Sequence, residues 1–382
     1  MIAYVFFTLL AALTAVYMLF LFRLRAGLRH IAQQPQGELP SVDDARLPAV
    51  TVLVPARNEA EQIDGLVASL RAQRYPVAKM EVLLLDDHSE DATHERAAAA
   101  ILGDARFRLL AMPEEGKKAA ITQGVQAACG DIIVTTDADC THDEDWLRAM
   151  SAPFLDGADV VAGPVVYQER TTLFERLQAL EFLGLMGVGA GFFGIGYPRL
   201  CNGANFAYRR ALFAAVAGFE GNDGVHSGDD EFLLHKIVYR EGGNAQFATA
   251  PASVVRTSGA PTLRAFLRQR IRWASKGRSY DDGRFVSFLV MLFVYFLFAA
   301  TAPLVSISSP AAMAAGMFFF VLKIIADVSV LYASAALFRQ PVRLSDLLAG
   351  EVLHAYYLVF VSIIGFSGGY TWKNRRVRNH RI

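Results

Sequence analysis

Long apolar stretches constrain this chain more than any other feature of its sequence. The first, residues 2–22, carries no charged residue, and Arg23, Arg25 and Arg29 follow it rather than precede it. A cleaved signal peptide has its basic residues in front of a shorter apolar run. We therefore predict an uncleaved transmembrane anchor at residues 1–22, with its C-terminal end in the cytoplasm.

Three further apolar stretches lie at 285–308, 311–338 and 347–366. Each is long enough to cross a bilayer, which predicts three C-terminal transmembrane helices within residues 285–370. Lys323 and Asp327 lie four residues apart, so on a helix they would share a face and could neutralise each other inside a bundle.

The last apolar stretch is the weakest of these predictions, because it contains Glu351 and His354. If it crosses the membrane, the basic tail at 371–382 emerges outside, against the positive-inside rule. Two interpretations stay open: either this segment is re-entrant or interfacial, or the tail breaks the rule.

The composition suits a chain that is part membrane and part soluble. Hydrophobic residues make up 53% of the sequence and the formal net charge is zero. A nucleic-acid-binding protein would carry a basic surplus, so this class is excluded. The cysteines, Cys129, Cys140 and Cys201, form no CxxC pair, which indicates neither a disulfide framework nor a zinc site.

The interior of the chain predicts one soluble domain, residues 49–284, after a polar linker at 23–48. Short β-branched or aliphatic runs predict buried strands at 49–55, 81–86 and 131–137, and an amphipathic pattern predicts a helix at 59–73. Strands that alternate with helices indicate an α/β fold with a mostly parallel sheet, in which ligands bind beyond the carboxyl ends of the strands.

Polar residues follow each of these strands. Asp137 and Asp139 are hard oxygen ligands suited to Mg²⁺ or Mn²⁺ on a substrate phosphate, although a solvated turn has the same pattern. Asp86 and Asp87 could accept hydrogen bonds from a nucleobase or ribose, with helix capping by Ser89 or Asp91 as the alternative. Lys117 precedes a helix and could contact phosphates, or lie in a plain surface loop.

Two motifs lie nearer the C-terminal stretches. Asp229, Asp230 and Glu231 are adjacent carboxylates, which raise one another's proton affinity and favour a general base; an acidic helix N-terminus is the alternative. The run 269–273, Gln-Arg-Ile-Arg-Trp, offers arginine for a diphosphate and tryptophan for stacking on a sugar. A juxtamembrane basic helix with an interfacial tryptophan would have the same composition.

These motifs, in this order, resemble the membrane-bound family 2 glycosyltransferases, such as ceramide glucosyltransferases and hyaluronan or poly-N-acetylglucosamine synthases. The match covers 49–280 and the flanking apolar stretches. It rests on Val54-Pro-Ala-Arg-Asn-Glu59, Asp86-Asp-His-Ser89, Asp137-Ala-Asp139, Gly228-Asp-Asp230 and Gln269-Arg-Ile-Arg-Trp273.

The resemblance implies a GT-A fold, that of nucleotide-diphospho-sugar transferases, and an inverting reaction. Asp230 would be the catalytic base and Asp139, with Asp137, would hold Mg²⁺ or Mn²⁺. The donor nucleotide and its diphosphate would be bound by Pro55, Arg57, Glu59, Asp86, Asp87, Lys117, Asp137, Gln269 and Arg272, and the acceptor by Asn202, Asp229 and Trp273. In the family the residue before the base is usually glutamate, so Asp229 is a departure.

The implied function is transfer of a sugar, expected from a UDP-sugar, to a lipid or lipid-linked acceptor at the cytoplasmic face of a bacterial inner membrane. Membrane lipids and the nucleotide-sugar donor are the expected partners, and nucleic acid is not. A processive polysaccharide synthase is the alternative enzyme, and an inactive membrane scaffold is the alternative from another class. The apolar, glycine-rich segment 173–199 is expected to be a membrane-facing loop or interfacial helix.

Overall fold

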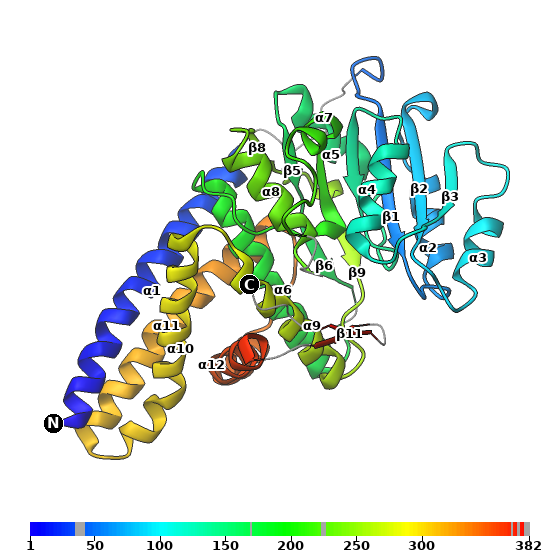
Figure 1. The fold of residues 1–382 in the computed structure, drawn as a ribbon. Helices are drawn as coiled ribbons and strands as arrows, with labels where there is room; N and C mark the ends of the chain where they lie inside the picture. Colours follow the sequence, from blue (N-terminus) through cyan, green and yellow to red (C-terminus); the bar gives the residue numbers. More distant parts are fainter. Residues whose placement is uncertain (35–42, 169, 223–226, 368–369, 373–374, 378–382) are drawn as a thin grey trace.

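The computed structural model describes residues 1–34, 43–168, 170–222, 227–367, 370–372 and 375–377. An α/β domain lies at one end of the molecule, and long apolar helices extend from it to the N-terminus at the other end (Figure 1). The mixed α/β class with a mostly parallel sheet, predicted from the sequence, is confirmed.

The sheet is built on three predicted strands. β1 (Val50–Ala56), β2 (Met80–Asp86) and β4 (Ile132–Thr135) pair in parallel, with β1 in the middle. Almost every residue of these strands is buried, because helices cover both faces of the sheet, and this accounts for their continuous apolar sequence. Their carboxyl ends therefore lie at one edge.

In the described chain the main sheet has the strand order β3-β2-β1-β4-β7-β5-β8. β7 runs antiparallel to β4 and to β5, while the other neighbours are parallel. A second small sheet pairs β6 with β9, and a hairpin pairs β10 with β11. The bounds are β3 Phe107–Ala111, β5 Val160–Ala162, β6 Val165–Tyr167, β7 Phe206–Arg209, β8 Ala245–Phe247, β9 Val255–Thr257, β10 Tyr370–Trp372 and β11 Arg375–Val377.

Helices of the α/β domain flank this sheet. The helix predicted at 59–73 is shorter, at Ile63–Arg71, because residues 57–62 form the turns that follow β1. The flanking helices are α2 Ile63–Arg71, α3 Thr93–Ala100, α4 Lys117–Ala127, α5 Trp146–Leu155, α7 Arg210–Ala215 and α8 Asp229–Tyr239, with α9 Leu263–Ser275 leading toward the apolar helices.

Within the described residues, five helices are long and apolar enough to cross a membrane. They are α1 Ile2–Ala32, α6 Leu173–Gly194, α10 Gly283–Ser306, α11 Pro310–Leu337 and α12 Leu344–Ser367. α1 continues ten residues past the predicted anchor, so the predicted linker at 23–48 is helical up to Ala32. Residues 35–42 of that linker, and 373–374 and 378–382 of the basic tail, lie outside the described residues.

The glycine-rich segment 173–199 contains a continuous helix, α6, so of the two expected alternatives, a loop or an interfacial helix, the structure has a helix. Its glycines permit close helix packing. A Cβ on Gly194 would lie 2.1 Å from the carbonyl oxygen of Gly27 in α1, and one on Gly187 would lie 1.8 Å from Oγ of Ser334 in α11. Small residues serve the same purpose in membrane bundles.

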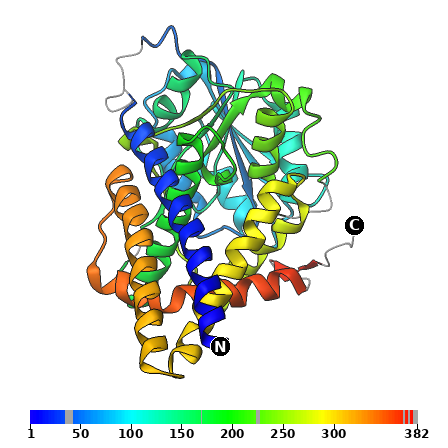
Figure 2. The same ribbon diagram turned by 90° about the vertical axis from the view of Figure 1, so that its left-hand side faces the viewer.

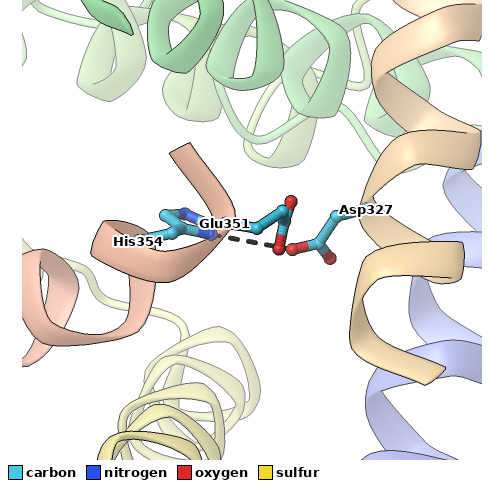
Figure 3. Close-up of side chains that lie close together, drawn as sticks. All are labelled: Asp327, Glu351 and His354. Carbon is cyan, nitrogen blue, oxygen red and sulfur yellow. Dashed lines mark ion pairs between the residues drawn. The ribbon is translucent and has the colours of Figure 1, made fainter. Parts of the chain in front are cut away.

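Helix α12 lies differently from the other C-terminal helices. α1, α10 and α11 run alongside one another, whereas α12 crosses them (Figures 1 and 2). A buried ionic cluster joins it to the bundle: Lys323 Nζ lies 2.7 Å from Oδ2 of Asp327, as the sequence predicted, and also bonds Glu351 of α12. His354 adds a contact of 3.6 Å to Asp327 (Figure 3).

The cluster is closed by α1, because the Tyr17 hydroxyl donates a 2.5 Å hydrogen bond to Asp327. Carboxylates of Asp327 and Glu351 with His354 are also metal-ligand types. Here the Lys323 ammonium lies between the two carboxylates and supplies the positive charge. The cluster therefore fixes how α1, α11 and α12 pack.

Candidate active site

The first part of the site lies where β1 and β2 end. Arg57, just after β1, donates a 3.2 Å hydrogen bond to the backbone oxygen of Asp87, just after β2. Asp87 is buried, and its carboxylate accepts a 2.9 Å hydrogen bond from the backbone N–H of Gly116. The adjacent strand ends are thereby tied to the residue that precedes α4.

Lys117, the first residue of α4, connects the strand ends to the acidic run of α8. Its Nζ lies 2.7 Å from Oδ1 of Asp137, which follows β4, and 3.5 Å from Oδ2 of Asp229. Burial lowers the pKa of Lys117, but the charges of Asp137 and Asp229 more than offset this and hold the pKa above its ordinary value. Lys117 is therefore a fixed cation among carboxylates and not a plain surface lysine.

The acidic run forms the first turn of α8. Gly228 precedes it in the left-handed conformation (φ +79), where a Cβ would also lie 2.9 Å from the Phe232 ring. The Asp230 carboxylate accepts hydrogen bonds from the backbone N–H groups of Gly203 (2.7 Å) and Glu231 (2.8 Å). The glycine thus sets the angle at which these acids meet the strand ends.

Asp229 and Asp230 differ electrostatically. Burial tends to raise the pKa of Asp229, but Lys117 beside it holds that pKa below its usual value. Burial and the neighbouring Asp229 charge raise the pKa of Asp230 to about 6. Asp229 is therefore the ionised partner of a lysine, whereas Asp230 has the proton affinity suited to accepting a proton near neutral pH.

Asp139 has a similarly raised pKa. Burial, Asp137 and Glu59 together raise it to about 6, so these three carboxylates lie close enough to repel one another. Such a group of hard oxygen ligands fits a divalent cation, which would relieve the repulsion. Asp137, 40% exposed, lies on the open side of the group.

The Gln-Arg-Ile-Arg-Trp run lies on α9, with the arginines in unequal roles. Arg270 is buried, donates 2.9 and 3.1 Å hydrogen bonds to the Glu181 carboxylate on α6, and lies 4.2 Å from the Trp273 ring. Gln269 accepts a 2.6 Å hydrogen bond from Arg270. Arg272 and Trp273 are both half-buried. Sequence reasoning missed Arg270 and Glu181, which hold α9 against α6.

The remaining candidates are Pro55, Asn202 and Asp86. Pro55 is part of β1 at the same edge, and Asn202 caps the turn before β7 through a 3.0 Å bond from the Ala204 N–H. Asp86 is occupied locally, by His94 at 2.9 Å and by the Ser89 N–H at 3.2 Å.

Two residues that the sequence did not single out, Lys276 and Tyr280, support the acidic run. Lys276 Nζ lies 2.8 Å from Glu231, which also bonds the Tyr280 hydroxyl. Burial lowers the pKa of Lys276, but Glu231 and Asp230 more than offset this and raise it. Glu231 is thereby committed to a structural pair, which leaves Asp230 as the acid with raised proton affinity in this run.

Comparison with known proteins agrees with this architecture. Residues 51–216 match the family model for glycosyl transferase family 2. The chain is 35% identical to glycosyltransferase AglE of Haloferax volcanii over 37% of this chain and 50% of that protein. It is 26% identical to the probable glycosyltransferase YdaM of Bacillus subtilis over 74% of this chain and 68% of that protein.

A solved structure shows the same fold over nearly the whole chain. The mannosyltransferase PcManGT of Pyrobaculum calidifontis, determined with GDP-mannose and Mn²⁺, aligns with a TM-score of 0.55 and 21% identity, covering 94% of this chain and 96% of that one. By contrast, the chain spans half the length of AglE. Residues 51–216 thus match a family 2 glycosyltransferase domain, their fold is the GT-A fold, and the described residues include five helices long and apolar enough to cross a membrane.

Proposed function

We propose that this protein is an inverting glycosyltransferase that moves a sugar from a nucleoside-diphosphate donor to a lipid or lipid-linked acceptor at the cytoplasmic face of a membrane. The observation that carries the proposal is the position of Lys117 between Asp137 and Asp229. It joins acids from a strand end and from a helix N-terminus, which are far apart in sequence, into one charged site.

The donor would bind across the carboxyl ends of β1, β2 and β4. Asp87 and Arg57 form the part of this edge suited to the base and ribose, with Pro55 and Glu59 beside them. Lys117 would exchange its contact with Asp137 for the donor diphosphate, since a lysine ammonium is a common phosphate partner. Asp86, already bonded to His94, would act by shaping this loop.

Asp137 and Asp139 would hold the divalent metal, Mg²⁺ or Mn²⁺. Burial, together with repulsion from Asp137 and Glu59, raises the pKa of Asp139 to about 6, and this crowding of carboxylates supports the assignment; PcManGT was solved with Mn²⁺. When bound, the ion would neutralise charge that develops on the leaving diphosphate. Gln269 and Arg272 of α9 are the proposed further contacts of that diphosphate.

Asp230 would take the proton from the acceptor hydroxyl as it attacks the anomeric carbon. Its pKa of about 6 leaves it mostly ionised at neutral pH while keeping substantial proton affinity. Asp229, held ionised by Lys117, would raise that affinity and adjoin the acceptor together with Asn202 and Trp273. A direct displacement of this kind inverts the configuration at the anomeric carbon.

The acceptor is proposed to enter from the bilayer. Helix α6 packs against α1 and α11 through its glycines and also carries Glu181, the partner of Arg270. The same helix thus connects the membrane bundle to the Gln-Arg-Ile-Arg-Trp run. Arg23, Arg25 and Arg29 at the domain end of α1 support a cytoplasmic domain.

A donor screen on purified protein with a bacterial lipid extract tests the proposal. Release of nucleoside diphosphate, together with one radiolabelled sugar on a lipid, is the expected result. Products that grow to polymer length would instead indicate a processive synthase. Failure of every nucleotide sugar to release a diphosphate with Mg²⁺ or Mn²⁺ present would contradict the proposal.

A further inference from the structure

A second basic site lies away from the strand ends, where the start of α6 meets the loop between α11 and α12. A cavity of about 110 Å³ opens there, and its described lining includes Arg170, Arg176 and Arg343 but only one carboxylate, Asp346. No motif of the glycosyltransferase site contributes to it. Positive charge is therefore in excess among the described lining residues, which favours an anionic ligand.

The one carboxylate is already committed. The Nε–H group of Arg176 is shared between the two carboxylate oxygens of the buried Asp346, at 3.1 and 3.2 Å. Nearby Glu175 is turned to the helix cap, where it accepts hydrogen bonds from the backbone N–H groups of Thr171 and Thr172. Neither acid is therefore positioned to neutralise the other two arginines.

Arg170 contacts only neutral oxygens among its described hydrogen-bond partners. Its guanidinium donates to the backbone oxygen of Tyr167 at 3.0 and 3.1 Å, to that of Pro341 at 3.5 Å, and to the Gln340 side chain. Burial lowers the pKa of Arg170. The protein thus holds this cation in place, half-buried, without an ion pair to any described residue.

Arg343 is exposed at the mouth of the cavity, and its side chain forms no hydrogen bond or ion pair with the described residues. The lining also includes apolar side chains, among them Ala179, Leu180 and Leu183 of α6. At the adjoining start of α12, Leu344 and Leu348 are 66% and 52% exposed. The cavity therefore combines cationic and apolar lining residues and adjoins an exposed apolar surface.

The depth of this site along the bundle suits a membrane surface. α12 joins the bundle at Asp327 and Tyr17, which lie 17 and 15 residues from the starts of α11 and α1. At 1.5 Å per residue these positions are roughly 25 Å from the far end, close to the thickness of a bilayer core of about 30 Å. If the far ends of α1 and α11 mark one face of the bilayer core, α12 lies near the headgroup region of the other face.

We propose that this cavity binds the phosphate group of an anionic membrane phospholipid, with Arg170 and Arg343 as its cationic contacts and the acyl chains along Leu344 and Leu348. A volume of about 110 Å³ suits a phosphate group. The apolar lining residues favour a lipid over free phosphate. This inference concerns lipid binding and stands apart from sugar transfer.

Binding of a short-chain phosphatidylglycerol to the purified full chain in neutral detergent, followed by microscale thermophoresis, tests the proposal. Arg343→Gln removes a charge without breaking a described contact, and it should weaken binding about tenfold or more. Arg170→Gln should do the same. The matched control is Arg339→Gln, in the same loop but outside this cavity, which should leave the affinity within about twofold.

The outcomes are separable. Equal losses in Arg343→Gln and Arg339→Gln would mean that only general surface charge attracts the lipid, and would overturn the site. Inorganic phosphate that competes at the same concentration, or farnesyl phosphate that binds more tightly than phosphatidylglycerol, would overturn the assignment to a phospholipid. Because no donor is present, these results do not depend on whether the protein transfers sugar.

Discussion

Replacing Asp230 with asparagine should lower turnover and, at the same time, remove an electrostatic penalty on the stability of the fold. The folded state raises the pKa of this carboxyl from 3.8 to about 6. The folded protein therefore binds the proton more tightly than the unfolded chain, and ionisation destabilises the fold. The penalty is absent below pH of about 4, grows between pH ~4 and ~6, and reaches roughly 3 kcal/mol above that.

Asparagine removes this penalty but introduces a cost of its own. Its amide can still accept one hydrogen bond, from Gly203, whereas the bond from the Glu231 N–H is lost or weakened. That cost, about 1–3 kcal/mol, does not depend on pH, so the pH dependence is the decisive quantity. Relative to wild type, the variant should gain about 1.5 kcal/mol between pH 5 and pH 8.

Asp229→Asn is the matched control, with the same chemical change one residue away. The pKa of Asp229 is lowered in the folded state by Lys117, so its charge stabilises the fold, and this contribution is lost only as the pH falls through the lowered pKa. The variant should therefore be less stable than wild type at pH 5 and at pH 8. It should also shift the acid limb of activity below pH of about 6, because the Asp229 charge raises the pKa of Asp230.

Denaturant unfolding in detergent at pH 5 and pH 8, with nucleoside-diphosphate release as the activity assay, measures both effects. Asp230→Asn should reduce turnover by about 10²-fold or more. If it retains wild-type turnover, Asp230 is not the base. If the stability difference between Asp230→Asn and wild type is the same at both pH values, the raised pKa of Asp230 is wrong.

Three further substitutions test other parts of the structure. Lys117→Met should raise the dissociation constant for a nucleoside diphosphate about tenfold, measured by calorimetry. Lys118 bonds a backbone oxygen instead, so Lys118→Met should change this constant little. Equal effects of the two substitutions would argue against a phosphate contact of Lys117. Gly27→Ala should lower the free energy of unfolding by about 1–3 kcal/mol, because the new Cβ would lie 2.4 Å from a carbonyl oxygen of α6. Gly65→Ala, with open space around the new Cβ, should leave that free energy unchanged or raise it by up to ~1 kcal/mol. A tolerated Gly27→Ala would refute the close packing of α1 on α6. Lys323→Met leaves two buried carboxylates without their cation and should lower the free energy of unfolding by about 3–5 kcal/mol. An unchanged midpoint of thermal unfolding would show that the ionic cluster does not stabilise the bundle.

The strands that carry the site could be predicted because their signal is local. β1, β2 and β4 are continuous apolar runs that end in polar residues, and a doubly covered parallel strand has this pattern. The convergence of the strand ends follows from the parallel topology, so Asp87 and Asp137 could be assigned to one edge. The pair of Lys323 with Asp327 followed from helical spacing alone.

What could not be predicted depends on contacts between distant segments. Glycines in α6 lower intrinsic helix propensity, so the sequence left a loop and an interfacial helix open, and the close packing of Gly194 against Gly27 accounts for glycine within the helix. The ion pairs of Lys117 join residues 20 and 112 positions away, a match that spacing does not determine.

On α9 a usable signal was overlooked. Phe266, Arg270 and Trp273 recur at positions i, i+4 and i+7, so they share one helical face. That face is the one turned toward α6, with Phe266 and Arg270 buried. The pattern would have pointed to Arg270, rather than Arg272, as the arginine that anchors this helix.

The proposed mechanism gives the carboxylates of one site separate roles: Asp137 and Asp139 hold the metal-bound donor, and Asp230 accepts the proton. Calorimetric titration of a nucleoside diphosphate, in the presence of Mn²⁺, into wild type, the Asp137→Asn/Asp139→Asn double variant and Asp230→Asn tests this directly. We predict that binding is lost in the double variant and unchanged in Asp230→Asn, which should nevertheless fail to turn over. Wild-type affinity in the double variant would contradict the assignment of the donor site.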